Sequence, residues 1–382
     1  MISKELISAI QNAKRPIFIW GAGVRRYAKQ ALHLARALGI PVATTWGAID
    51  CIAHDDPLMA GGFGTHGTRA ANFAVQNADV AISLGSRLDT KATGDPKTFV
   101  RGGQIFMVDI DVHEQRKFDR LGRIVIPIEQ DAGEFIESME PAIDKYQTYA
   151  YERIQWKKQI IEWRQLYDTP KVTWPGINPY EFVKELGKYT TADDIICSDT
   201  GTALGYMMQG FPFKGERFLH AFNMTPMGYG LPAAVGAALA GTERQRVILI
   251  TGDGSFMMSL AEMATVTRWN LNIKIILLNN GGHAMCRQTE RQWFGGKHQS
   301  TTVESGLGFP NWDNVNPFFG IERFSALVRM FSHNRPGFMV VDIHPDAYLI
   351  PQARFGAPIE DQEPLLPRDE FRAQMIGAEP IT

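Results

Sequence analysis

The chain has 382 residues, and its 39 basic and 41 acidic side chains leave a net charge of −2. Mixed charges of this kind argue against nucleic acid or an acidic membrane surface as the main partner, and the length allows two domains. No apolar run approaches a membrane span, residues 1–6 do not resemble a signal peptide, and Cys51, Cys197 and Cys286 lie too far apart for a disulfide framework or metal motif. A cytoplasmic protein is therefore expected.

Residues 1–145 alternate short apolar runs with helical patterns. Runs that stop at polar or glycine-rich turns are typical of buried parallel strands, and they occupy 16–20, 41–45, 79–84, 104–108 and 123–127. Helices are expected over 27–38, 68–77 and 131–139. The alternation predicts an α/β domain with a parallel sheet. Gly21 and Gly23 suggest a dinucleotide turn, but Arg26 replaces the third glycine of that fingerprint.

Residues 146–176 are rich in charged and aromatic side chains. Ile154, Trp156, Ile161 and Trp163 fall at helical intervals. We expect a helical linker that runs over the surface between two domains. Its aromatic residues are expected to pack on a domain rather than to bind a ligand.

Residues 177–345 repeat the alternation, and residues 346–382 form a tail. Strands are expected at 194–198, 248–251 and 275–278, and helices at 179–189, 203–209 and 259–269. A right-handed strand–helix–strand crossover places the last two strands in one parallel sheet, with their carboxyl ends at the same edge. Open α/β sheets bind ligands at that edge.

Polar residues follow these two strands. Asp253 and Asn280 supply a carboxylate and an amide oxygen, and the Gly281–Gly282 turn supplies a carbonyl. Such a sparse set of hard oxygens suits Mg²⁺ that also binds phosphate and water. Gly254 and Ser255 open the next helix, where free N–H groups can hold a diphosphate. The alternative is two ordinary strand ends with turn residues.

Two motifs carry a family resemblance. Gly252-Asp253-Gly254-Ser255 with Asn279-Asn280 resembles the thiamine-diphosphate motif of the acetohydroxyacid synthase and pyruvate decarboxylase superfamily, and residues 224–234 are similar to its MGFGLPAA segment. The resemblance to acetolactate (acetohydroxyacid) synthase-like proteins covers nearly the whole chain. It implies an α/β fold of two doubly wound parallel-sheet domains, a Rossmann-like central domain and a thiamine-diphosphate-binding domain.

The resemblance also assigns roles to residues of the second domain. Asp253, Asn280 and the carbonyl of Gly282 would bind Mg²⁺. Met227 would be the apolar wedge that bends the cofactor, although a methionine here is otherwise usually core filler, and the carbonyl of Thr225 would accept a hydrogen bond from the 4′-amino group. The remaining cofactor contacts would be Thr200, Gly201, Thr202, Gly252, Gly254, Ser255, Asn280, Gly282 and His283.

Two departures from the family pattern are visible. Thr202 and Ala203 follow the glycine where synthases usually carry Gln and His, and a plain helix cap by Asp199 or Thr202 is the alternative for this turn. Thr289 stands where synthases carry Trp, and the chain in this respect looks closer to the acetolactate-synthase-like proteins found with sugar and polysaccharide biosynthesis.

Catalytic residues are expected just after the asparagines. His283 and Gln288 are expected to face the reacting carbon. The alternative for His283 is an exposed residue at the start of a helix.

The first domain resembles the central domain of acetohydroxyacid synthases at 64–72, 85–94 and 108–111. Several members of that group hold FAD there without using it for redox chemistry. The implied FAD contacts are Gly21, Gly23, His66, Arg87 and Asp109. The alternative is a flavin-free domain of the same fold, in which Arg87 pairs with a carboxylate.

Enzymes of this architecture have a further domain that binds the aminopyrimidine ring and supplies a glutamate to its nitrogen. None of Glu134, Glu137 and Glu262 can be assigned that role. We therefore expect a subunit or fragment of an acetolactate synthase-like 2-oxo acid decarboxylase and carboligase, acting on pyruvate in a homo- or hetero-oligomer with a pyrimidine-domain partner. The alternative is a truncated or regulatory protein that binds thiamine diphosphate or a nucleotide without catalysis.

Overall fold

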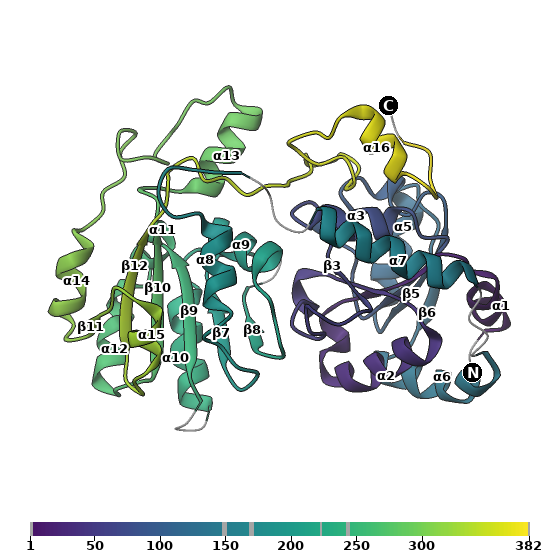
Figure 1. The fold of residues 1–382 in the computed structure, drawn as a ribbon, viewed down its shortest axis with the longest axis horizontal. Coiled ribbons are helices and arrows are strands. Elements are labelled where there is room, and N and C mark those ends of the chain that lie inside the picture. The colour runs from purple at the N-terminus through teal and green to yellow at the C-terminus, as the bar shows by residue number, and fades with distance from the viewer. Residues whose placement is uncertain (1–2, 147–150, 168–171, 222–223, 242–244, 381–382) are drawn as a thin grey trace. The chain divides into compact units, whose positions relative to one another are not determined.

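A computed structural model describes residues 3–146, 151–167, 172–221, 224–241 and 245–380. The chain forms two compact units, and the first also takes in the C-terminal segment (Figure 1). Unit 1 comprises Met1–Pro170 and Ile350–Thr382, and unit 2 comprises Lys171–Leu349. Among the described helices, none has both the length and the apolar run needed to cross a bilayer.

Unit 1 contains a six-stranded, all-parallel sheet in the order β3-β2-β1-β4-β5-β6. The strand order reverses between β1 and β4, as in doubly wound dinucleotide-binding folds. The strands are β1 Pro16–Trp20, β2 Val42–Thr44, β3 Met59–Gly62, β4 Val80–Leu84, β5 Gln104–Asp109 and β6 Ile126–Glu129.

Helices and short 3-10 turns connect the strands of unit 1. The helix over Ala28–Leu38, for example, buries Ala31, Leu34, Ala35 and Leu38 at helical spacing, as the sequence pattern predicts. The helices and turns of unit 1 are α1 Lys4–Asn12, η1 Ala22–Tyr27, α2 Ala28–Leu38, η2 Trp46–Ala48, α3 Arg69–Gln76, α4 Thr90–Thr93, η3 Pro96–Thr98, α5 Val112–Arg120, α6 Ala132–Tyr146, α7 Tyr151–Leu166 and α16 Arg368–Gln374.

The helix expected between the domains, α7, is part of the core of unit 1 and lies beside α3 (Figure 1). Trp156 and Trp163 are almost fully buried and contact each other edge to face. Trp163 also packs on the Phe73 ring and donates a hydrogen bond to Gln374 in α16. Apolar burial thus fixes both α7 and the C-terminal segment on unit 1. Residues 147–150 and 168–171 of the expected linker lie outside the described residues.

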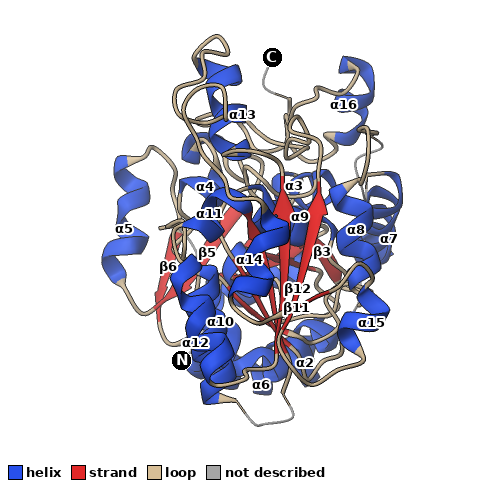
Figure 2. Cartoon of the chain, turned by 90° about the vertical axis from the view of Figure 1, so that its left-hand side faces the viewer, coloured by secondary structure: helices blue, strands red, loops and turns tan. Residues whose placement is uncertain are grey.

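Unit 2 contains a second six-stranded parallel sheet in the order β8-β7-β9-β10-β12-β11, with helices on both faces (Figure 2). The strands are β7 Ile195–Ser198, β8 Arg217–Leu219, β9 Val247–Gly252, β10 Ile273–Asn279, β11 Glu322–Arg323 and β12 Gly337–Asp342. The helices are α8 Pro179–Leu186, α9 Thr202–Gly210, α10 Gly230–Ala240, α11 Asp253–Met257, η4 Leu260–Glu262, α12 Met263–Arg268, α13 Ala284–Trp293, α14 Trp312–Phe318 and α15 Leu327–Phe331.

The connection from β9 to β10 differs from the single helix expected over 259–269. It begins earlier, at Asp253, and consists of α11, η4 and α12. Ser259, with φ −128°, leaves the helical conformation between the first two pieces. As a result, α11 begins directly where the buried strand β9 ends.

Candidate functional site

The carboxyl ends of β7, β9 and β10 lie side by side at one edge of the unit 2 sheet. Strand β7 pairs with β9, and β9 pairs with β10 up to Leu278 opposite Gly252. The chain connects β7 first to β8 on one side and then returns to β9 on the other, so the topological switch point lies between β7 and β9. Ligands of open α/β sheets bind in the crevice at such a point. The polar turns at Asp199, Asp253 and Asn280 surround it.

The carboxylate of Asp253 joins two of these turns. It is completely buried, and its Oδ1 accepts a hydrogen bond from the N–H of Gly254 at 2.8 Å. Its Oδ2 accepts from the N–H groups of Asn280, Gly281 and Gly282 at 3.2, 2.7 and 3.2 Å. Burial raises the pKa of Asp253 to about 6, although the four N–H donors lower it.

The second predicted metal ligand, Asn280, is 9% exposed and contacts an arginine that sequence reasoning had missed. Nη2 of Arg287 donates to the Oδ1 of Asn280 at 3.1 Å, to its backbone oxygen at 3.3 Å and to the carbonyl of Pro345 at 2.8 Å. Gly282 forms an isolated antiparallel bridge with Thr302. The three predicted metal ligands are therefore close together, because both Asn280 and Gly282 bond Asp253 through their N–H groups.

The turn after β7 presents backbone to open space. Gly201 has φ +98° and precedes α9 without any side-chain cap, so the expected alternative of a cap by Asp199 or Thr202 is wrong. A Cβ added at Gly201 or at Gly252 would meet no heavy atom within 4 Å. Uncapped N–H groups at the start of a helix, with free space before them, suit an anionic ligand.

Asp199 has a different role, which the sequence did not reveal. Its buried carboxylate accepts from the N–H of Gly228 at 3.1 Å, of Gly230 at 2.8 Å and of Thr200 at 2.9 Å. It therefore ties the turn after β7 to the segment that carries Met227. The signal was a carboxylate at the end of a buried strand, and two of its three partners lie 29 and 31 residues away in sequence.

Met227 and His283 meet at Gly254. A Cβ at Gly254 would lie 2.3 Å from Nδ1 of His283 and 3.4 Å from Cε of Met227, so only glycine fits there. Both side chains are half-buried, and burial, followed by the charge of Arg287, lowers the pKa of His283. This supports a place for His283 within the site over that of an exposed helix residue. Next to Met227, the non-glycine Thr225 has φ +40°, a strained conformation that often occurs at functional sites.

Gln288 is held by backbone contacts. Its Nε2 donates to the carbonyl of Leu349 at 2.8 Å, and its Oε1 accepts from the N–H of Leu349 at 3.1 Å. Both ends of the amide are occupied, which favours a positioning role over the predicted catalytic one. Ser255 is also buried, and its hydroxyl contacts the carbonyl of Thr200 at 3.5 Å.

Thiamine diphosphate with Mg²⁺ fits the chemistry of this donor set. Asp253 is a buried carboxylate, and no basic side chain among the described residues forms an ion pair with it. A buried charge of this kind calls for a counter-ion. No three His, Cys, Asp or Glu side chains gather as a metal cluster within the described ranges. One carboxylate with neutral oxygens is the kind of site at which Mg²⁺ also takes phosphate oxygens.

The residues expected to contact FAD lie at the carboxyl edge of the unit 1 sheet, but each has a role within the chain. Gly21 and Gly23 pack against Gly85. A Cβ added at Gly21 would lie 2.3 Å from the backbone oxygen of Gly85, and one added at Gly23 would lie 2.8 Å from the Cα of Gly85. Arg87 lies 3.7 Å from Glu114. Oδ1 of Asp109 accepts a hydrogen bond from the N–H of Asp111. His66 is buried against the rings of Trp46 and Phe355, and its two ring nitrogens are hydrogen-bonded to Thr65 and Gln352.

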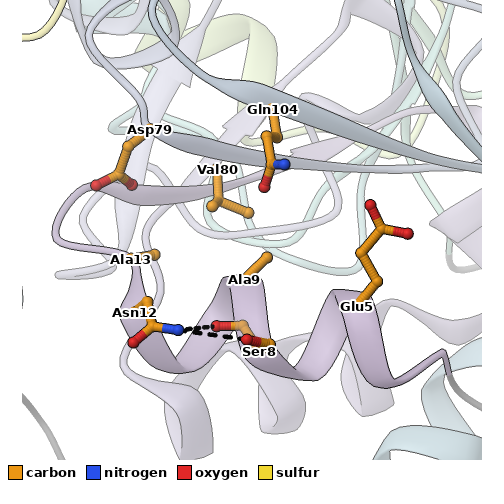
Figure 3. Close-up of a pocket in the computed structure, with 8 residues that line it drawn as sticks. All are labelled: Glu5, Ser8, Ala9, Asn12, Ala13, Asp79, Val80 and Gln104. Atoms are coloured by element: carbon orange, nitrogen blue, oxygen red, sulfur yellow. Dashed lines mark hydrogen bonds between the residues drawn. The ribbon is translucent and has the colours of Figure 1, made fainter.

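A separate hollow of about 380 Å³ lies between α1 and the sheet of unit 1 (Figure 3). Its lining includes Glu5 and Asn12 from α1, and Asp79 and Gln104 at the start of β4 and β5. Both carboxylate oxygens of Asp79 accept N–H groups of Lys14 and Arg15. This hollow lies at the amino ends of the strands, opposite the edge where such sheets bind ligands.

Comparison with known families matches both units. The family profile described as "Thiamine pyrophosphate enzyme, central domain" matches residues 3–139. The profile described as "Thiamine pyrophosphate enzyme, C-terminal TPP binding domain" matches residues 199–336, which include the polar turns at Asp199, Asp253 and Asn280.

Curated relatives agree with these matches. The chain is 30% identical over 335 residues to the acetolactate synthase large subunit of Porphyra purpurea, covering 85% of this chain and 55% of the relative. It is 28% identical over 389 residues to the acetolactate synthase isozyme 1 large subunit of Escherichia coli K12, covering 98% and 64%. A probable acetolactate synthase large subunit of Methanococcus aeolicus is 32% identical over 337 residues, covering 84% and 55%.

The chain thus spans between about half and two thirds of the length of these relatives. The parts that it matches are the central and the cofactor-binding domains. Each profile matches one of the two units, and each unit holds one six-stranded parallel sheet. The chain therefore belongs to the thiamine pyrophosphate enzymes and is acetolactate synthase-like.

Proposed function

We propose that unit 2 binds Mg²⁺ and the diphosphate of thiamine diphosphate, and that the chain thereby serves an acetolactate synthase-like decarboxylation and carboligation of a 2-oxo acid such as pyruvate. The observation that carries this proposal is the buried Asp253 carboxylate at the switch point, joined to the Asn280–Gly282 turn by three N–H bonds. The names of the curated relatives support the reaction class.

Each part of the site has a separate task in this proposal. Asp253, Asn280 and the Gly282 carbonyl hold the metal, and the backbone at Gly201 and Gly252 faces the diphosphate. Met227 supports the cofactor from below, with its segment held by Asp199. His283 lies against Gly254, where it excludes water and can hold a proton on its neutral ring. When bound, thiamine diphosphate supplies the electron sink that lets a 2-oxo acid lose CO₂.

Activation of the aminopyrimidine ring requires a glutamate beyond these residues. Glu262 lies in η4, where its carboxylate accepts from Thr265, and Glu134 and Glu137 belong to α6 of unit 1. We therefore assign this task to a pyrimidine-binding domain outside the 382 residues. The active protein would be a homo- or hetero-oligomer in the cytoplasm, a compartment in which the three free cysteines stay reduced.

The test of this function is cofactor binding. Calorimetric titration of the chain with thiamine diphosphate is expected to give heat of binding only when Mg²⁺ is present. The variant Asp253→Ala is expected to lose this binding, whereas Asp193→Ala, an exposed carboxylate before the neighbouring strand, keeps it. Equal binding by the wild type and Asp253→Ala would refute the proposed site.

The alternative is a regulatory chain that binds the cofactor without catalysis. This alternative is favoured because none of Glu134, Glu137 and Glu262 can be assigned to the aminopyrimidine ring. Release of CO₂ from pyruvate by the chain, alone or with a pyrimidine-domain protein that co-purifies with it from its native cell, would exclude this alternative. Binding without turnover in the presence of such a partner would support it.

We further propose that unit 1 is a flavin-free structural domain. The pairing of Arg87 with Glu114 supports this, as do the Asp109 contact with Asp111 and the close packing of Gly21 and Gly23 on Gly85. These contacts occupy the groups that would otherwise receive FAD.

A further inference from the structure

Arg287 is a buried cation that forms no ion pair with a described residue. It lies in the first turns of α13 and is 4% exposed. Its Nη2 contacts only neutral oxygens, two on Asn280 and one on Pro345. Its Nε has no hydrogen-bond partner, and among the described residues no carboxylate lies within ion-pair distance of the guanidinium. Glu304 interacts with it electrostatically, but this carboxylate is exposed to solvent, which screens its charge. A guanidinium does not lose its proton in proteins, so this charge is permanent.

The charge of Arg287 lies beside the proposed metal site of Asp253 and Asn280. Asn280 Oδ1, which receives Arg287, is also a proposed ligand of the metal. A divalent cation that arrives alone would therefore approach one carboxylate and one guanidinium, which together carry no net charge. Like charges at short range in a buried site repel strongly. The cation alone is thus expected to bind weakly.

A diphosphate changes this balance. Its negative charge would be attracted both to the metal and to Arg287, so the complex of metal and diphosphate compensates the guanidinium that the protein leaves unpaired. The planar guanidinium fork of arginine also matches the geometry of a phosphate, as it does that of a carboxylate. Each of the two ligands then favours binding of the other.

We propose that Arg287 couples metal binding to diphosphate binding, so that the site fills with both ligands together and with neither alone. This rests on the proposed function, because it takes Asp253 and Asn280 as the metal site. Arg287 acts as a positioning and charge-compensating residue, which need not touch the reacting atoms.

The experiment uses the full chain, with Mn²⁺ as the metal and inorganic pyrophosphate as the anion. Free Mn²⁺ is followed by electron paramagnetic resonance with and without pyrophosphate. For the wild type, pyrophosphate is expected to tighten Mn²⁺ binding by roughly 5- to 150-fold, the usual range of coupling between sites. By reciprocity, Mn²⁺ must tighten pyrophosphate binding by the same factor, which calorimetry checks.

Variants separate charge from hydrogen bonding. Arg287→Met and Arg287→Gln remove the charge, and Gln keeps a donor for Asn280. Both are expected to bind Mn²⁺ alone more tightly than the wild type and to lose most of the coupling. Arg287→Lys keeps the charge without the planar fork and is expected to keep the coupling. Arg291→Gln, in the same helix and paired with Asp346 on the surface, is the matched control.

The outcomes are distinguishable. If the wild type binds no Mn²⁺ even with pyrophosphate, the proposed function fails and this inference fails with it. If the wild type binds both ligands but Arg287→Gln shows the same coupling, only the inference is overturned. If Arg287→Met does not fold, as judged by circular dichroism, the Gln and Lys variants decide. A purely structural arginine would weaken Mn²⁺ binding in every variant, with the coupling factor unchanged, and this result also overturns the inference.

Discussion

The proton on Asp253 competes with the metal. Burial raises the pKa of this carboxyl from 3.8 to about 6, whereas a metal ligand must be ionised. The affinity for Mg²⁺ with thiamine diphosphate is therefore expected to fall as the pH is lowered through about 6, with one proton released from Asp253 for each metal bound below that pH. Calorimetry in two buffers of different ionisation enthalpy measures this release. A proton count that stays at zero on both sides of pH 6 would contradict it.

The same shift affects the stability of the metal-free protein. Because the folded state holds this proton more tightly than the unfolded state, its contribution to stability is complete below pH 3.8 and is lost as the pH rises through about 6. A difference of about 2 pKa units corresponds to about 3 kcal/mol. The unfolding free energy of the wild type, relative to that of Asp253→Ala, is therefore expected to fall as the pH rises from 3.8 through about 6. Urea titration at several pH values across this range measures the difference.

Asp199 is expected to stabilise both the fold and the cofactor site. Replacing it by Ala leaves three N–H groups without an acceptor, the buried one of Gly230 and the half-buried ones of Gly228 and Thr200. Each such loss costs roughly 1 to 3 kcal/mol, so we expect the unfolding free energy to fall by on the order of 3 kcal/mol. Urea titration measures this change, and Asp193→Ala serves as the control. A variant as stable as the wild type would show that these contacts contribute little.

At the scale of elements, α7 holds unit 1 together. Trp163→Ala removes a ring that is 1% exposed and packs on Phe73, together with its hydrogen bond to Gln374. Substitutions of this kind cost roughly 3 to 5 kcal/mol. We expect the transition of unit 1 to move to lower urea while that of unit 2 is unchanged, as monitored by hydrogen exchange. Ile161→Ala, on the exposed side of the same helix, is expected to have little effect.

At the scale of the whole molecule, the purified protein is expected to be colourless. Arg87 and Asp109 have partners within unit 1, and Gly21 is closed off by Gly85. The absorption spectrum of the protein, and of the supernatant after denaturation, checks for flavin. Flavin bands in an amount equal to the protein would contradict the flavin-free proposal and restore the FAD contacts expected from the sequence.

The sequence by itself determined the fold class and the strand ends of the cofactor site. Buried parallel strands such as Val247–Gly252 and Ile273–Asn279 contain runs of four apolar residues, Val247–Ile250 and Ile275–Leu278, so they are visible without a structure. Their order along the chain, with a helix between them, is enough to bring Asp253 and Asn280 to one edge. Shorter strands such as Met59–Gly62, which has no β-branched residue, carry no such signal.

Only the tertiary structure decided how side chains are used. The sequence predicts that Trp156 and Trp163 pack on a domain, and only the structure shows that they belong to the core of unit 1 beside α3. Asp199 is a candidate helix cap in the sequence, and nothing in the sequence singles out Arg287. Most of their partners are backbone groups of Gly228, Gly230, Asn280 and Pro345, and backbone groups have no sequence signature. Such contacts exist only once the chain has folded.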